Sequence, residues 1–342
     1  MRRPAYFARG CAYCTKRGIR IMCTCIALTQ RGKFYFGRNL DLEYGFGEKA
    51  VCVPRSFPFR FAFAPAQERH YALTGTASLE GGVPLFADAC NEKGVCMAGL
   101  YFPGNAHYFP APEAGAHNLA PYELIPWILG ACSSAAEAAE LLRGVHLVAK
   151  PFSERLPLAP LHWMAADGEG CYVAEPTEDG MRVYENGARV LTNNPPFPYH
   201  MTRLNDFMAL SPAQPQNSFA PELPLRPYGQ GMGGIGLPGD ASPSSRFVRA
   251  AFYAANSVCE EGEEVAQFFH VLGSVSMPRG GVRTPEGKND VTRYACCMDT
   301  ESGTVFYTTY GCGRPAAVRM VREGKELSVF SLPEREDVLY LN

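Results

Sequence analysis

The sequence predicts an α+β fold in which runs of β-strands flank a central block of helices. Short apolar runs of β-type residues lie towards both ends of the chain, and helical spacing of apolar residues is confined to residues 122–272. Apolar residues make up 46% of the 342 residues and charged residues 19%. This composition supplies a substantial core, so the sequence excludes a disordered chain.

The predicted strands begin at Cys23, where strand-like patterning first occurs. Residues 23–29 and 33–37 are β-type runs separated by the turn-forming Gln30-Arg31-Gly32, which predicts a hairpin. The same signals predict further strands at residues 50–53, 83–87, 94–100, 161–166, 171–175, 189–192, 292–298, 304–310, 317–321 and 327–330.

The predicted helices lie in the middle of the chain. A serine N-cap at 133 or 134 begins a helix that reaches residue 142, and a Ser-Pro start predicts a second helix over 243–255. Apolar residues at i, i+3, i+4 and i+7 predict a third over 265–272, and a fourth is expected around 122–129. Residues 211–240 are rich in Pro, Gly and Ser, which indicates long loops.

Charge and hydropathy exclude several classes of partner. The formal net charge of −2 supplies no field for nucleic acid or for an anionic membrane. No apolar run reaches the roughly 20 residues that span a bilayer, and residues 1–22 lack the apolar core of a secretory signal. The 13 cysteines are odd in number and irregularly spaced, which favours free thiols in a reducing cytoplasm over a disulfide scaffold.

Two local motifs suggest other functions but lack the necessary context. Gly229, Gly231 and Gly234 match GxGxxG, but prolines on both sides prevent the strand and helix that a dinucleotide site requires. Cys11 and Cys14 form a CxxC ahead of Cys23, so a zinc or redox module is an alternative hypothesis of a different class. We expect no metal and no cofactor.

Residues 1–22 differ from the rest of the chain. They carry six basic residues and no acidic residue, with neither strand alternation nor a helical stripe. We interpret them as a tail, a removable propeptide or a start assigned too early, because Met22 directly precedes Cys23. Residues 23–342 are then expected to form a single domain.

Cysteine at a chain terminus combines two catalytic groups. Its thiol is a nucleophile and its α-amino group, with a pKa of about 8, is a base near working pH. Arg38 and Asp41 follow the second predicted strand, and the hairpin is expected to bring both beside Cys23. Arg38 can lower the thiol pKa and Asp41 can hold the amine; a surface Arg–Asp turn is the alternative.

These motifs resemble the choloylglycine hydrolase family, which includes bile salt hydrolases and penicillin V acylases. The resemblance extends from residue 22 to about 312. It is carried by ordered matches: Met22-Cys23-Thr24, Phe36-Gly37-Arg38-Asn39-Leu40-Asp41, Asn91-Glu92-Lys93-Gly94, Leu161-His162-Trp163-Met164, Leu191-Thr192-Asn193, and Gly229-Gln230-Gly231 through Gly236-Leu237-Pro238-Gly239-Asp240 to Ser245-Arg246-Phe247.

The resemblance implies a role for each matched site residue. Cys23 is the nucleophile, and its freed amine is the base. Arg38 and Asp41 orient and tune it, and Asn193 donates its amide to the oxyanion. Arg246 completes the charged network. A cation in the first turns of a helix opposes the helix dipole, so we expect an anionic partner for Arg246.

Tyr101 is the position that bears on substrate choice. Bile salt hydrolases typically have asparagine at this position, whereas penicillin V acylases have tyrosine. The resemblance implies that this position contacts the oxyanion through its backbone N–H. Tyr101 is therefore expected at the rim of the substrate pocket. The wider match, including Gly104-Asn105-Ala106-His107-Tyr108, is more similar to bile salt hydrolases.

The resemblance also implies the architecture and the reaction. The fold is a four-layer αββα sandwich of two antiparallel sheets between helical layers, the N-terminal-nucleophile (Ntn) hydrolase fold, in a bacterial cytoplasmic homotetramer. The reaction is hydrolysis of a linear amide through an acyl-enzyme thioester. Glycine- or taurine-conjugated bile salts are the expected substrates, penicillin V is the alternative, and N-acyl homoserine lactones are third. A catalytically inactive binding relative is a further alternative.

Overall fold

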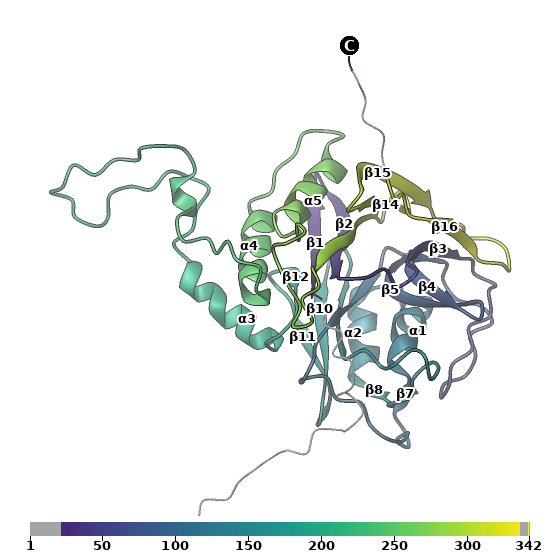
Figure 1. Cartoon of the computed structure of the whole chain (residues 1–342). Helices are drawn as coiled ribbons and strands as arrows, with labels where there is room; N and C mark the ends of the chain where they lie inside the picture. The colour runs from purple at the N-terminus through teal and green to yellow at the C-terminus, as the bar shows by residue number, and fades with distance from the viewer. Residues whose placement is uncertain (1–21, 336–340, 342) are drawn as a thin grey trace, which may run out of the picture.

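Two antiparallel β-sheets lie face to face between two pairs of helices in the computed structural model, which describes residues 22–335 and 341 (Figure 1). The first sheet has six strands in the order β12 (Val190–Leu191), β1 (Met22–Gln30), β2 (Lys33–Leu42), β13 (Val291–Asp299), β14 (Thr304–Thr309) and β15 (Cys312–Arg319). All neighbouring strands in this sheet are antiparallel.

The second sheet has eight strands and is also antiparallel throughout. Its order is β11 (Gly180–Glu185), β10 (Cys171–Thr177), β9 (Leu161–Ala166), β6 (Cys96–Tyr101), β5 (Val83–Asn91), β4 (Leu73–Glu80), β3 (Lys49–Val53) and β16 (Ser328–Ser331). A small parallel pair, β7 (His117–Leu119) with β8 (Val145–Leu147), lies apart from both sheets.

Helices cover the outer face of each sheet (Figure 1). The helices α4 (Pro243–Ala255) and α5 (Glu264–Gly273) pack on the first sheet, and α1 (Leu124–Ala131) and α2 (Ala135–Arg143) pack on the second. Ser134 caps α2 and Ser242 caps α4, each by accepting a backbone N–H three residues on, as the sequence predicted.

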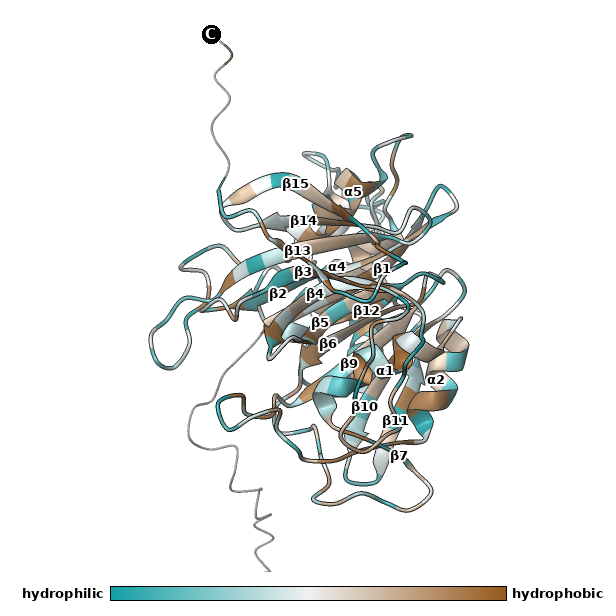
Figure 2. Ribbon diagram, turned by 90° about the vertical axis from the view of Figure 1, so that its right-hand side faces the viewer, coloured by the Kyte–Doolittle hydropathy of each residue, from teal (hydrophilic) through white to brown (hydrophobic). Residues whose placement is uncertain are grey.

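Two apolar cores separate the layers. Met164 and Ala166 of β9 belong to the core between the sheets, and the alternating Trp163 and Ala165 belong to the core beneath α1 and α2. Because a strand alternates its side chains, β9 is buried on both faces. Hydrophobic residues follow the strands of both sheets, whereas the peripheral loops are largely hydrophilic (Figure 2). The αββα sandwich is thereby confirmed.

Several elements are longer than predicted or were not predicted. β2 continues to Leu42, β4 and β11 had no prediction, and α3 (Phe197–Arg203) was also missed. Gly75 weakens the strand signal of β4, yet a Cβ there would lie 2.1 Å from the Asp88 carbonyl oxygen of the neighbouring strand. The close approach of β5 therefore requires glycine at position 75, although this glycine weakens the sequence signal of β4.

The helix around 122–129 forms despite its proline. A short 3₁₀ turn (Pro121–Glu123) leads into α1, and Pro126 occupies the third helical position. The N–H groups of the first turn have no intrahelical partner, so a proline there costs no hydrogen bond.

Residues 211–240 are loops, as predicted, with one 3₁₀ turn at Met232–Gly234. Gly229, Gly231 and Gly234 lie in this segment, which has neither the strand nor the opening helix of a dinucleotide site. Together with α3 and a second 3₁₀ turn (Leu204–Phe207), the segment projects from the body as a teal-green arm (Figure 1).

Candidate active site

The β1–β2 hairpin places Cys23 at the start of β1, with its side chain between the sheets. Cys23 pairs with Leu40 and Cys25 pairs with Arg38, so Arg38 lies on the same face as Cys23 and diagonally across from it. Gly37 permits this arrangement, because a Cβ there would lie 1.9 Å from the Cys296 carbonyl oxygen of β13.

Arg38 connects the thiol to the second sheet. Its Nη2 donates to Cys23 Sγ, and its Nη1 donates to the carbonyl oxygens of Gly99 (2.6 Å) and Ala87 (3.2 Å). The side chains of Cys23 and Arg38 are essentially inaccessible to solvent. Two backbone acceptors, on β5 and β6 of the second sheet, therefore hold the guanidinium against the sulfur.

The charge state of the thiol is determined by competing effects. Burial has the largest effect on the pKa of Cys23 and raises it, and the charge of Asp41 raises it further. The charges of Arg38 and Arg246 and the backbone N–H of Tyr101 lower this pKa. The net effect is a raised pKa of the Cys23 thiol. Its use as a nucleophile therefore requires a base that takes the thiol proton.

Asn193 follows β12 and contacts three elements of the site. Its Oδ1 accepts the backbone N–H of Cys23 (3.0 Å) and Nη2 of Arg246 (2.7 Å). Its Nδ2 donates to the carbonyl oxygen of Tyr101 (2.8 Å). The two donors on Oδ1 fix the orientation of the amide, so Nδ2 is directed at the segment that also supplies the Tyr101 N–H.

Arg246, in the first turn of α4, contacts the opposite face of β1. It donates to the backbone oxygen of Cys23, to Thr24 Oγ1 (2.6 Å) and to the Ala241 carbonyl oxygen (3.0 Å), in addition to Asn193. Among the described residues all of these partners are neutral oxygens, so the expected anionic partner makes no direct hydrogen bond. Asp41 acts on Arg246 only through charge.

Asp41, which the sequence predicted to hold the Cys23 amine, lies on the face of the hairpin opposite the thiol. It pairs with Met22, three residues beyond Arg38, and an odd spacing along a strand places the two side chains on opposite faces. Its Oδ1 accepts from Thr292 Oγ1 (2.6 Å), whereas the buried Oδ2 has no partner among residues 22–335. Burial raises the pKa of Asp41 to about 6, against the lowering effect of Arg246.

Tyr101 ends β6 and presents its backbone to the sulfur. A hydrogen bond from its N–H is among the effects that lower the pKa of Cys23. The whole residue is 9% exposed, and its place at the rim of the substrate pocket stays a prediction. The predicted site residues Cys23, Arg38, Asn193 and Arg246, with the Tyr101 backbone, therefore meet at one point.

A buried acidic group near Arg38 was missed at the sequence level. Asp88 of β5 accepts from the Tyr294 hydroxyl (2.5 Å), from the Thr76 N–H (3.3 Å) and from the Cys296 thiol (3.7 Å). Burial raises the pKa of Asp88, and Arg38 opposes this shift. No local motif marks Asp88, because its hydrogen-bond partners come from two distant strands, β4 and β13.

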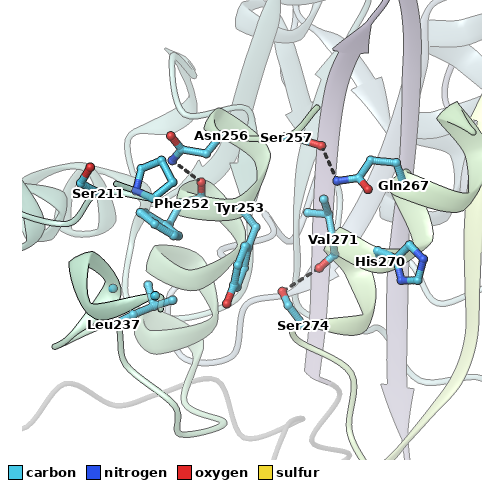
Figure 3. A pocket seen from close by; sticks show the side chains of 13 residues that line it. Ser211, Leu237, Phe252, Tyr253, Asn256, Ser257, Gln267, His270, Val271 and Ser274 are labelled. Carbon is cyan, nitrogen blue, oxygen red and sulfur yellow. Dashed lines mark hydrogen bonds between the residues drawn. The ribbon is translucent and has the colours of Figure 1, made fainter. Parts of the chain in front are cut away.

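A hollow of about 650 Å³ opens elsewhere, between the arm, α4 and α5 (Figure 3). Tyr253, Gln267 and His270 line it together with Ser211 of the arm, and none of the residues around Cys23 does.

Other sequence expectations concern metals, membranes and thiols. Within 22–335, no group of histidine, cysteine and acidic residues is arranged to hold a metal ion, and no helix is long and apolar enough to cross a membrane. Cysteines from Cys23 to Cys312 are free thiols, and all but Cys259 are buried. Cys11 and Cys14 lie outside the described residues.

Comparison with known proteins extends over most of the chain. Bile salt hydrolase/transferase of Lactiplantibacillus plantarum is 42% identical over 322 residues, which are 93% of this chain and 99% of that protein. A variant of conjugated bile acid hydrolase from Clostridium perfringens superposes with a TM-score of 0.87 at 35% identity, over 94% of this chain and all of the other. Penicillin V acylase from Agrobacterium tumefaciens shares the fold at a TM-score of 0.70 and 20% identity, over 90% of each chain.

The family model for linear amide C–N hydrolases of the choloylglycine hydrolase family matches residues 23–327. That match begins at Cys23 and contains every site residue described above. The chain therefore belongs to the choloylglycine hydrolase family and is a hydrolase of linear amide C–N bonds.

Proposed function

We propose that this enzyme removes glycine or taurine from conjugated bile salts, with Cys23 as the nucleophile. The observation that carries the proposal is the convergence on the buried Cys23: Arg38 and the Tyr101 N–H contact its thiol, and Asn193 Oδ1 accepts its backbone N–H. Relatives of 42% and 36% identity bear the name bile salt hydrolase/transferase, and each aligns over at least 99% of its own length.

The proposed reaction proceeds through a thioester. The α-amine of Cys23 accepts the thiol proton as sulfur attacks the amide carbonyl carbon. The amine then gives this proton to the departing nitrogen, and glycine or taurine leaves as the C–N bond breaks. Water hydrolyses the thioester by the same proton route and restores the thiol. Asn193 Nδ2 and the Tyr101 N–H stabilise the oxyanion in both steps.

The mechanism requires a free amine, so we propose that the active chain is residues 23–342, a single domain without residues 1–22. The family match beginning at Cys23 supports this proposal. Asp41 Oδ2, which has no partner among residues 22–335, supports it independently, because Asp41 pairs with Met22, the residue directly before the Cys23 nitrogen. An ammonium there would satisfy the buried acceptor.

Penicillin V is the alternative substrate, followed by N-acyl homoserine lactones. Tyr101 favours penicillin V, because its ring can stack on a phenoxyacetyl group. The identity to bile salt hydrolases, against 20% to the penicillin V acylase, favours bile salts.

We also propose a homotetramer in the bacterial cytoplasm. The arm exposes large apolar side chains, including Phe219 (86% exposed) and Tyr228 (89% exposed), which another subunit would cover. The free thiols of the described cysteines are typical of a reducing compartment.

Intact mass and amine release test the proposal together. The expected results are a chain that begins at Cys23, release of glycine and taurine from glycocholate and taurocholate, and slower hydrolysis of penicillin V. Full activity from a chain that retains residues 1–22 contradicts the free-amine mechanism. Binding of bile salts without turnover indicates an inactive relative, and about one zinc per chain by metal analysis indicates the Cys11–Cys25 module.

A further inference from the structure

The segment that carries Asn193 is closed by a buried pair that the reaction does not itself use. His162 lies on β9 and Glu175 on β10, with their side chains 0% and 2% exposed. His162 Nδ1 is 3.2 Å from Glu175 Oε1, and Nε2 is 3.0 Å from the Thr192 carbonyl oxygen. Thr192 directly precedes Asn193.

The hydrogen-bond partners determine where the protons lie. The Thr192 carbonyl can only accept, so Nε2 of His162 carries a proton. Nδ1 faces Glu175 Oε1. Glu175 Oε1 also accepts the backbone N–H of Phe197 (2.9 Å). The pair therefore joins residue 192 to residue 197 and closes the loop that contains Asn193.

The same imidazole contacts the other side of the oxyanion site. The ring of His162 stacks on Phe102, with the centroids 4.2 Å apart and the planes at 5°. Phe102 follows Tyr101, whose backbone N–H points to the sulfur. His162 thus contacts the residue before Asn193 and the residue after Tyr101. Asn193 and the Tyr101 N–H are the two oxyanion donors of the proposed reaction.

We infer that His162 is a positioning residue that sets the separation of the Asn193 amide and the Tyr101 N–H, with Glu175 holding the ring in place. The inference rests on the proposed function of these two donors. Donors stabilise an oxyanion only within a narrow range of distances, and a displacement of 1 Å can cost about 100-fold in rate. The hydrogen bonds of His162 go to Glu175 and to the Thr192 carbonyl oxygen, not to Cys23.

Two substitutions separate the contacts of the ring. His162→Phe keeps an aromatic ring against Phe102 and removes both hydrogen bonds, whereas His162→Gln keeps a donor for Thr192 and removes the ring. We expect kcat on glycocholate to fall about 10- to 100-fold in His162→Phe and less than about tenfold in His162→Gln. KM should stay within about threefold, because binding of the steroid is not altered.

Alkylation of Cys23 by iodoacetamide is the second readout, since it reports the nucleophile without the oxyanion. Its rate should stay within about twofold of wild type in both variants. His70→Phe is the matched control: His70 is buried, its Nε2 lies 2.7 Å from the Phe57 carbonyl oxygen, and its ring is 4.6 Å from Phe59, but it contacts none of the site residues. This control should lower Tm and leave kcat unchanged.

A double substitution tests the coupling directly. In an Asn193→Ala background, His162→Phe should cost much less than it does alone, because one of the two donors is already absent. Unchanged kcat in His162→Phe, a parallel fall in the alkylation rate, or full additivity with Asn193→Ala overturns the inference. If His162→Phe does not fold, wild-type kcat in His162→Gln overturns it and a three- to tenfold loss supports it.

Wild-type activity distinguishes failure of the positioning role of His162 from failure of the proposed function. Turnover that Cys23→Ala abolishes, together with unchanged kcat in the His162 variants, leaves the proposed function standing and removes only the positioning role. Absence of amine release by the wild-type enzyme removes both.

Discussion

One fully buried arginine packs on each face of the β1–β2 hairpin, Arg38 of β2 on one and Arg246 of α4 on the other. The two arginines differ in their surroundings. Arg38 lies between the sheets, where burial lowers its pKa but Cys23, Tyr294 and Asp88 outweigh that effect and raise it. Arg246 lies under the helices, where burial lowers its pKa and Asp41 offsets this only in part. Both are 0–1% exposed, so burial alone does not explain the difference.

The difference separates two tasks. Arg38 lies among anionic or ionisable neighbours and donates to the sulfur, so it acts on the charge of the Cys23 thiol. Arg246 donates to neutral oxygens of Cys23, Thr24 and Asn193, so it acts on their positions. The inner face therefore supplies electrostatics and the helix-side face supplies geometry.

The largest expected effect is on the inner face. Cys23→Ala should remove turnover by at least about 10⁴-fold, because the substituted chain has no nucleophile. Cys25→Ala is the matched control: Cys25 is equally buried on the same face, and burial raises its pKa well above the usual value. The control should keep most of its activity in an amine-release assay. Retention of activity by Cys23→Ala contradicts the assignment of the nucleophile.

Exchanging each arginine for methionine tests the division between the faces. Arg38→Met should slow alkylation of Cys23 at least about tenfold, because one unit of thiol pKa changes the thiolate fraction tenfold. Arg246→Met should lower kcat about 100-fold through displacement of Asn193, with a much smaller change in alkylation. Iodoacetamide kinetics and steady-state hydrolysis measure the two effects. Equal changes in alkylation for both variants would show that the faces do not have separate tasks.

The pH dependence of stability examines the helix-side face. The folded pKa of Asp41 is about 6, above its usual value of 3.8, so its neutral form is favoured by folding. Its contribution is fully present below pH 4 and is lost as the pH rises through 6, a change of about 3 kcal/mol in the free energy of unfolding.

This loss should occur in a chain that retains the residues before Cys23, and Asp41→Asn should abolish it. A chain that begins at Cys23 should show a smaller loss, because its α-ammonium lowers the pKa of Asp41. Urea unfolding between pH 3.5 and 7 measures the change. Asp290, whose pKa burial also raises to about 6, should give a similar loss in both chains, so Asp290→Asn should leave the difference between the two chains in place. Identical profiles for the two chains would place the amine away from Asp41.

The smallest expected effect concerns Tyr101, which meets the inner face through its backbone. Tyr101→Asn should raise bile-salt hydrolysis and lower penicillin V hydrolysis several-fold, without collapse of either kcat, because the N–H that faces the sulfur is retained. The ratio of kcat/KM on the two substrates measures the change. Equal changes on both would show that Tyr101 does not determine specificity, and complete loss on both would place its side chain in the catalytic set.

Local signals were sufficient wherever neighbours in sequence are also neighbours in space. The turn at residues 30–32 predicted the β1–β2 hairpin and hence the diagonal approach of Arg38 to Cys23. The serine caps of α2 and α4 were read from single residues. Asp41 was expected to hold the Cys23 amine, and strand alternation places its side chain on the face opposite Arg38 and the thiol.

The sequence by itself determined the family, the αββα fold and the set of residues that meet at Cys23, because ordered motifs and local patterns carry that information. Only the tertiary structure decided which groups support them. Asp88 near Arg38, and His162 and Glu175 beside Asn193, were not assigned to the site, although His162 lies in a motif that matches the family. A buried polar group needs a partner, but the sequence does not state which distant strand supplies it; the pairing of the strands and the packing of the two sheets do.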